Sequence, residues 1–184
     1  MKIIFDCDGV LADWTAYLLV KLNCGLTIDD CFEFSMRKVL RAHRDNATAK
    51  RADIIVSNPS FTLSQPVLPW ARRIVELAHE LGDLCIVTSP WAADGWYDAR
   101  IKWLKQNLGI HQDNILVGRR KNWVEADIFV DDKIANVVEW ATAFPNGQAI
   151  LLAWPYNANY SELPSNVKRM TSEELVAFLE SMIK

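Results

Sequence analysis

The first thirteen residues constrain the fold more than any other part of this 184-residue chain. Residues 1–5 are mostly apolar, and the run then changes abruptly to Asp6, Cys7, Asp8 and Gly9. A short strand with apolar residues on both faces is typical of a parallel sheet covered by helices, in which ligands bind at the carboxyl ends of the strands. Two aspartates at i and i+2 on a continuing strand point the same way, and their like charges favour a bound cation.

The composition predicts one sizeable core with room for a small second lobe, since 51% of the residues are hydrophobic and the mean hydropathy is near zero. The net charge of −3 argues against a generally basic nucleic-acid surface. No apolar run approaches the roughly 20 residues of a membrane span, and the start lacks the features of a signal peptide. We therefore expect a cytoplasmic monomer or homodimer that binds neither membranes nor, stably, nucleic acid. The four cysteines lack metal-ligand spacing and are expected to be free thiols.

Strand and helix patterns alternate from residue 66 onward, which predicts a doubly wound parallel α/β sheet. Apolar runs predict strands over 84–87, 114–117, 128–130 and 149–152. Helical patterns cover 69–81, the stretch from Trp96 to a stop at Gly109, the region around 137–140, and a final helix from Ser172.

The segment between the first strand and residue 66 has a helical pattern and no strong strand signal. Asp13 is placed to cap a helix that Gly25 ends, and Thr27 and Asp30 form a capping-box pattern. We therefore predict a helical cap over 14–65, inserted into a core formed by 1–13 and 66–184.

Polar residues follow three of the expected strands. They are Asp6 and Asp8, then Thr88 and Ser89, then Asp131 and Asp132, with Lys121 just before the third of these strands. Because the carboxyl ends of parallel strands meet at one edge, these groups converge on one crevice. Acids and hydroxyls suit a hard cation such as Mg²⁺ that in turn holds a phosphate. The three histidines lie away from these strand ends, which disfavours a zinc site or a histidine-based nucleophile.

This arrangement resembles the haloacid dehalogenase (HAD) superfamily of phosphotransferases over most of the chain. The matching motifs, in the order of the family, are the apolar strand with Asp6-x-Asp8-Gly9-Val10, the strand ending in Thr88, Lys121, and the strand ending in Asp131-Asp132. The resemblance implies a Rossmann-like core with a small cap.

The resemblance also implies a role for each acid. Asp6 would be the nucleophile that forms an aspartyl phosphate, and Asp8 the acid and then the base. Mg²⁺ would be held by the Asp6 carboxylate, the Asp8 backbone carbonyl and Asp131, with Asp132 supporting this shell.

The remaining strand-end groups would serve the phosphoryl group. The resemblance implies that Thr88 and Ser89 hydrogen-bond its oxygens and that Lys121 offsets the negative charge.

Within the superfamily the chain is most similar to the 5′(3′)-deoxyribonucleotidases. The similarity lies in residues 6–13 followed by the aromatic Trp14, in Phe61 before a proline-rich turn, in the Thr-Ser-Pro of 88–90, and in Lys121 ten residues before the acid pair.

In that family aromatic side chains stack on the nucleotide base, which implies pocket positions for Trp14, Phe61 and Trp91; packing in a core is the alternative for each of them. Lys133 stands where the mammalian-type enzymes are expected to have arginine. It keeps the charge without the guanidinium fork, so nucleotide preference is expected to differ.

The predicted function is therefore a Mg²⁺-dependent phosphatase that acts on deoxyribonucleoside monophosphates, with a small-molecule nucleotide as its partner. Two alternatives remain open from the sequence. The same catalytic site would also suit another small phosphomonoester, such as a sugar phosphate, or a polynucleotide end. A phosphate-binding module without turnover is the non-enzymatic alternative.

Overall fold

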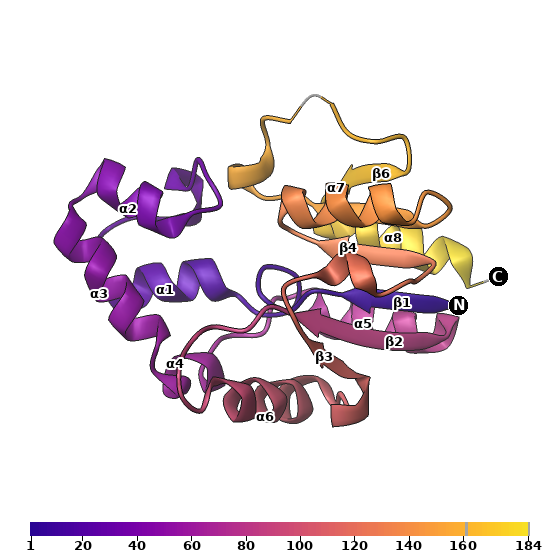
Figure 1. Cartoon of the computed structure of the whole chain (residues 1–184), viewed down its shortest axis with the longest axis horizontal. Coiled ribbons are helices and arrows are strands. Elements are labelled where there is room, and N and C mark those ends of the chain that lie inside the picture. The colour runs from indigo at the N-terminus through magenta and orange to yellow at the C-terminus, as the bar shows by residue number, and fades with distance from the viewer. Residues whose placement is uncertain (161, 184) are drawn as a thin grey trace.

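The computed structural model describes residues 1–160 and 162–183, and within them the core is a six-stranded, fully parallel sheet (Figure 1). The strand order is β3-β2-β1-β4-β5-β6, which places β1 in the interior of the sheet between β2 and β4. The strands are β1 (Lys2–Phe5), β2 (Asp83–Thr88), β3 (Ile115–Val117), β4 (Ile128–Asp131), β5 (Gln148–Leu152) and β6 (Val167–Met170). The predicted fold class is confirmed.

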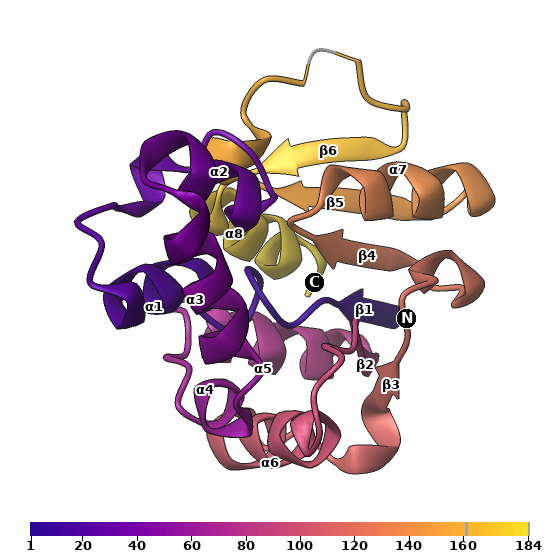
Figure 2. The same ribbon diagram turned by 60° about the vertical axis from the view of Figure 1, so that its left-hand side comes forward.

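Helices cover both faces of the sheet, as the continuous apolar runs of its strands require (Figures 1 and 2). One face carries α5 (Ala71–Leu81), α6 (Trp96–Leu108) and α8 (Ser172–Met182), and the other carries α7 (Ile134–Ala143). In β1, Ile3 and Phe5 join the first of these cores and Ile4 joins the second, because successive side chains of a strand point to opposite faces.

Residues 14–65, which lie between β1 and α5 in the sequence, form a helical lobe at one end of the molecule (Figure 1). It contains α1 (Trp14–Leu22), α2 (Met36–His43), α3 (Asn46–Val56) and α4 (Pro59–Leu63). Its buried side chains, Leu18 and Val39 among them, form a cluster distinct from those on the two faces of the sheet, and Tyr156, from outside the lobe, joins this cluster. The lobe therefore has its own small core.

The predicted helix signals of the lobe are largely in place. The Asp13 side chain accepts a hydrogen bond from the Ala16 N–H and caps α1, and Thr27 with Asp30 forms a capping box. The box opens only one 3₁₀ turn, and α1 ends at Asn23 in a left-handed conformation, two residues before the predicted Gly25.

Short 3₁₀ turns connect several of these elements. They are η1 (Ile28–Asp30), η2 (Gln112–Asn114), η3 (Lys121–Trp123) and η4 (Pro155–Asn157). All four cysteines are free thiols. In the described part of the chain no helix combines the length and apolarity needed to cross a membrane.

Candidate active site

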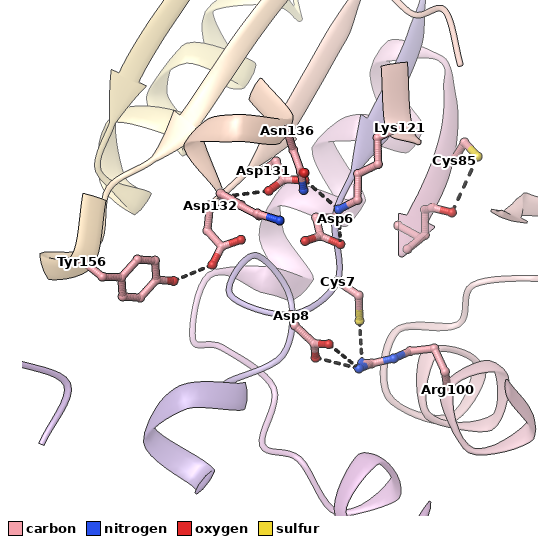
Figure 3. Close-up of polar contacts among 12 residues, drawn as sticks. Asp6, Cys7, Asp8, Cys85, Arg100, Lys121, Asp131, Asp132, Asn136 and Tyr156 are labelled. Atoms are coloured by element: carbon pink, nitrogen blue, oxygen red, sulfur yellow. Dashed lines mark hydrogen bonds and ion pairs between the residues drawn. The ribbon is translucent and has the colours of Figure 1, made fainter. Parts of the chain in front are cut away.

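Of the polar residues predicted at strand ends, Asp6, Asp131 and Asp132 lie together at one edge of the sheet (Figure 3). Asp6 directly follows β1, Thr88 ends β2 and Asp131 ends β4, and these three strands are neighbours. The Asp6 N–H donates to the Val130 carbonyl at 2.9 Å, which extends the pairing of β1 with β4 and fixes the Asp6 backbone. Thr88 is buried at the end of β2, the strand next to β1.

Lys121, on the turn η3, forms ion pairs with two of the acids at this edge. Its Nζ lies 2.7 Å from Asp6 Oδ1 and 2.6 Å from Asp131 Oδ2. Burial opposes the charged form of Lys121, but the two carboxylates raise the lysine pKa above its ordinary value. Burial raises the pKa of the Asp6 carboxyl to about 7, although the Lys121 ammonium acts in the opposite direction. The pairs are thus held in a site largely removed from water.

Asp132 faces the same centre and is held by η4. The Tyr156 hydroxyl donates to Asp132 Oδ2, and the Asn157 side-chain amide donates to the Asp132 backbone carbonyl at 2.8 Å. Burial and the negative charge of Asp131 raise the pKa of Asp132 well above its ordinary value. Sequence reasoning missed Tyr156 and Asn157; they follow the carboxyl end of β5, so the rule used for the other strands would have pointed to this loop.

The donor set of this centre fits a hard divalent cation. Asp6, Asp131 and Asp132 each offer a carboxylate oxygen, and these oxygens lie within 4.8 Å of one another. Three buried carboxylates face one buried ammonium group, so the cluster lacks positive charge. An all-oxygen set with this charge matches the preferences of Mg²⁺.

Asp131 and Asp132 differ in how many hydrogen bonds their carboxylate oxygens accept. Both oxygens of Asp131 accept bonds from the protein: Oδ1 from the Lys133 N–H, and Oδ2 from Lys121 and Asn136. Asp132 Oδ1 accepts none from the residues that the structure describes. Asp132 Oδ1 is thus the oxygen of this pair most open to a cation, whereas the sequence predicted Asp131 as the ligand and Asp132 as its support.

Asp8 turns away from this centre and takes a different partner (Figure 3). Because β1 ends at Phe5, Asp6 and Asp8 do not lie on one continuing strand, and the expectation that they point the same way is corrected. Arg100 Nη2, on α6, donates to both Asp8 oxygens at 2.6 and 2.7 Å. Sequence reasoning missed Arg100. The sequence feature that points to Arg100 is its spacing: it lies four residues after Trp96 and three before Trp103, which places a cation on the buried face of the helix.

A cavity of about 660 Å³ lies between the helical lobe and the edge of the sheet, and most predicted site residues line it. From the strand ends and the loops that follow them these are Asp6, Asp8, Thr88, Ser89, Trp91, Asp132 and Lys133, and from the lobe Trp14. Lys121 and Asp131 are buried and do not belong to this lining.

The aromatic wall of the cavity differs from the prediction at one position. Phe61 is not part of the lining; it is 4% exposed and packs in the core of the lobe, with its ring 6.0 Å from Trp14 and 5.2 Å from Tyr17. Phe34 lines the cavity in its place, is 48% exposed, and lies 5.3 Å from Lys133 Nζ. Which aromatic of the lobe faces the sheet depends on helix packing, which the sequence pattern does not specify.

Comparison with known proteins identifies the family of this chain. Residues 1–176 match the family model described as 5′ nucleotidase, deoxy (pyrimidine), cytosolic type C protein. The human 5′(3′)-deoxyribonucleotidase, cytosolic type, is 28% identical over 182 residues, covering 94% of this chain and 89% of the human protein.

Solved structures share the fold at low identity. A haloacid dehalogenase-like hydrolase from Burkholderia xenovorans is 17% identical, with a TM-score of 0.58 over 97% of this chain and 94% of that one. A HAD hydrolase from Bacillus subtilis, solved with bound magnesium, is 16% identical, with a TM-score of 0.55 over 97% and 98%. With its sheet-edge acids, its lysine and this family match, the chain is a phosphoric monoester hydrolase of the HAD superfamily and belongs to the cytosolic type C 5′-nucleotidase family.

Proposed function

We propose that this enzyme is a Mg²⁺-dependent 5′(3′)-deoxyribonucleotidase that works through an aspartyl-phosphate intermediate. The observation that carries the proposal is the position of Asp6, which lies on the cavity wall while one of its oxygens is held 2.7 Å from the buried Lys121 Nζ. A carboxylate fixed in this way at the base of a nucleotide-sized cavity is suited to attack phosphorus.

In the first step an Asp6 oxygen forms a bond to phosphorus while the ester P–O bond breaks. The electron pair of that bond passes to the leaving oxygen, which takes a proton from the Asp8 carboxyl group. Thr88 and Ser89, both on the cavity wall, donate hydrogen bonds to the phosphoryl oxygens, and Lys121 offsets the negative charge.

In the second step the Asp8 carboxylate takes a proton from water, and the water oxygen attacks phosphorus. The bond between phosphorus and Asp6 breaks, the electron pair returns to the Asp6 carboxylate, and inorganic phosphate leaves. The two steps together consume one water molecule and return both aspartates to their starting state.

We assign the cation to Asp6, the backbone carbonyl of Asp8, and Asp132, with Asp131 positioning Lys121. Close packing of the loop on Asp132 supports this set, because a β-carbon added at Gly9 would lie only 2.3 Å from Asp132 Oδ2. When bound, Mg²⁺ would neutralise negative charge on the acids and on the phosphoryl oxygens.

We also propose that the helical lobe, residues 14–65, is a substrate-selecting cap on a core formed by 1–13 and 66–184. Phe34, Trp14 and Trp91 give the cavity an aromatic wall, and each stacked ring contributes roughly 1–3 kcal/mol to holding a base. A sugar phosphate has no flat ring to use this wall, so the wall favours a nucleotide. The cytosolic type of the human relative supports a cytoplasmic location.

The test is phosphate release by the purified protein, with Mg²⁺ and with EDTA, from paired ribo- and deoxyribonucleoside monophosphates and a panel of sugar phosphates. Release that needs Mg²⁺ and favours deoxynucleotides is the expected result. Metal-dependent release from sugar phosphates or from polynucleotide ends instead would refute the assignment of the cap. Full activity of an Asp6→Asn variant would refute the mechanism.

A further inference from the structure

The Asp8 carboxylate is held from one side by a single, fully buried guanidinium (Figure 3). Arg100 Nη2 contacts both carboxylate oxygens, at 2.6 and 2.7 Å, and Arg100 has no exposed surface. Asp8 is the one carboxylate within ion-pair distance of Arg100 among the residues 1–160 and 162–183. The orientation of Asp8 thus depends on where Arg100 is fixed.

Arg100 itself is immobilised by its surroundings on α6. Its Nη1 donates to Cys7 Sγ at 2.8 Å and to Gln65 Oε1 at 3.2 Å, and its guanidinium lies 5.4 and 5.8 Å from the ring centroids of Trp96 and Trp103. Trp103 in turn donates to the Gln65 carbonyl at 2.9 Å. A guanidinium held through Nη1 and flanked by two rings has little freedom, so it presents Nη2 to Asp8 as a fixed donor.

The burial of the two partners is unequal, and this inequality argues for a role beyond stability. The Asp8 side chain is 32% exposed, so water can solvate its charge without help from Arg100. The Arg100 charge is completely buried, and the loss of its hydration is often not offset by an ion pair. An apolar side chain on this helix stripe would avoid that cost. The arginine does one thing that an apolar residue could not do: it fixes the position of the Asp8 carboxylate.

We propose that Arg100 is a positioning residue that fixes the Asp8 carboxylate at the wall of the substrate cavity. This inference rests on the proposed function of Asp8 as the acid that protonates the leaving oxygen. Asp8 is followed by Gly9 in a tight loop, and without Arg100 its side chain would be free to rotate in the cavity. General acid catalysis contributes about 10²- to 10⁴-fold only when the acid is well placed, so part of this factor depends on Arg100.

Substrates with different leaving groups separate this role from a merely structural one. A nucleotide releases a sugar alkoxide, which needs the proton from Asp8, whereas p-nitrophenyl phosphate releases a stable phenolate that needs it far less. Loss of positioning should therefore slow nucleotide hydrolysis much more than p-nitrophenyl phosphate hydrolysis. Damage to the fold would lower both rates by the same factor.

The experiment compares Arg100→Met and Arg100→Lys with the parent on both substrates, measuring kcat and KM with Mg²⁺ at fixed pH. For Arg100→Met we expect kcat for the nucleotide to fall about 10- to 100-fold more than kcat for p-nitrophenyl phosphate, with KM changed less than about threefold. Arg100→Lys keeps the charge but not the fork, and should recover part of that difference. If Arg100→Met fails to fold, as judged by circular dichroism, the lysine variant alone decides.

Leu104→Ala is the matched control, because Leu104 is another buried residue of α6, and its apolar side chain makes no hydrogen bond to Arg100 or Asp8. Its loss of packing should lower both rates together and leave their ratio near that of the parent. Equal losses on the two substrates in the Arg100 variants, or the same change of ratio in Leu104→Ala, would overturn the proposal. If the parent hydrolyses p-nitrophenyl phosphate and a sugar phosphate but no nucleotide, the proposed function fails, and the same ratio measured with that sugar phosphate still tests Arg100.

Discussion

Replacing Gly9 by alanine should test how tightly the first loop is packed against the acid pair. Gly9 has a left-handed backbone, with φ of +79°, and an added β-carbon would lie 2.3 Å from Asp132 Oδ2 and 2.6 Å from Asp132 Cγ. The loop cannot easily move away, because the Trp154 indole N–H donates to the Gly9 carbonyl at 2.8 Å and the Gly9 N–H donates to the Ala12 carbonyl at 2.9 Å. Alanine at this position therefore has two separate costs: the strain of a left-handed backbone and the steric overlap with Asp132.

Gly109 provides a control that carries only one of these costs. Its φ is +68°, but nothing lies within 4 Å of an added β-carbon. Alanine in a left-handed conformation costs about 1–2 kcal/mol, and overpacking a well-packed site costs a further 1–3 kcal/mol or so. Gly109→Ala should therefore lose about 1–2 kcal/mol of unfolding free energy, and Gly9→Ala about 2–5 kcal/mol. The entropy that alanine removes from the unfolded chain is common to both variants.

Urea unfolding in EDTA, followed by circular dichroism, measures both losses from the shift in midpoint at constant m-value. Repeating Gly9→Ala in an Asp132→Ala background removes the two closest contact atoms, so its penalty should fall toward that of Gly109→Ala. The reasoning is refuted if Gly9→Ala costs no more than Gly109→Ala, or if its penalty is the same in both backgrounds.

Three further predictions follow from the site. Asp6→Asn should lower phosphate release by roughly 10³-fold or more while leaving the circular dichroism spectrum unchanged; residual turnover near the parent level would contradict a nucleophilic Asp6. Burial raises the pKa of both Asp6 and Asp132, so the folded, metal-free protein holds more protons than the unfolded chain between about pH 4 and 7. Its unfolding free energy in EDTA should therefore fall as the pH rises through that range, and less steeply in Asp6→Asn; a rise with pH would contradict this assignment. Phe34→Ala should raise the KM for nucleotides with little loss of stability, whereas Phe61→Ala should cost about 3–5 kcal/mol of unfolding free energy; the opposite pattern in steady-state kinetics and urea unfolding would restore Phe61 to the pocket.

The sequence predicts the centre of the fold and the inner part of the site well, for a physical reason. Strands buried on both faces must be apolar throughout, so 84–87 and 128–130 stand out in the sequence. Acids that follow parallel strands lie at the common carboxyl edge of the sheet, so the sequence alone predicts that Asp6 and Asp131 are close together. The edge strand β6 was missed because Lys168 and Arg169 interrupt its apolar pattern, as is typical of an exposed edge.

The outer part of the site depends on packing that a linear pattern does not encode. Arg100 lies on the buried face of α6, where helical periodicity alone predicts an apolar residue. From the sequence, a charged residue at such a position is most simply interpreted as reaching solvent. Tyr156 reaches Asp132 from the loop after β5, a contact set by how that loop crosses the edge of the sheet. For Phe34 and Phe61 the choice depends on which side of the lobe faces the cavity, and both residue types are common in cores and pockets.

The two aspartates of the first motif differ in surroundings far more than in chemistry. Asp6 lies deep in the site, against Lys121 and two further acids, with a pKa raised to about 7 by burial. Asp8 keeps a third of its side chain open to the cavity and has a buried cation of its own in Arg100. Because each carboxylate has a separate cation, the two do not compete for Lys121, and each can take a distinct part in one reaction. The turn after Phe5 makes this separation possible, since a continuing strand would have pointed both acids at the same partner.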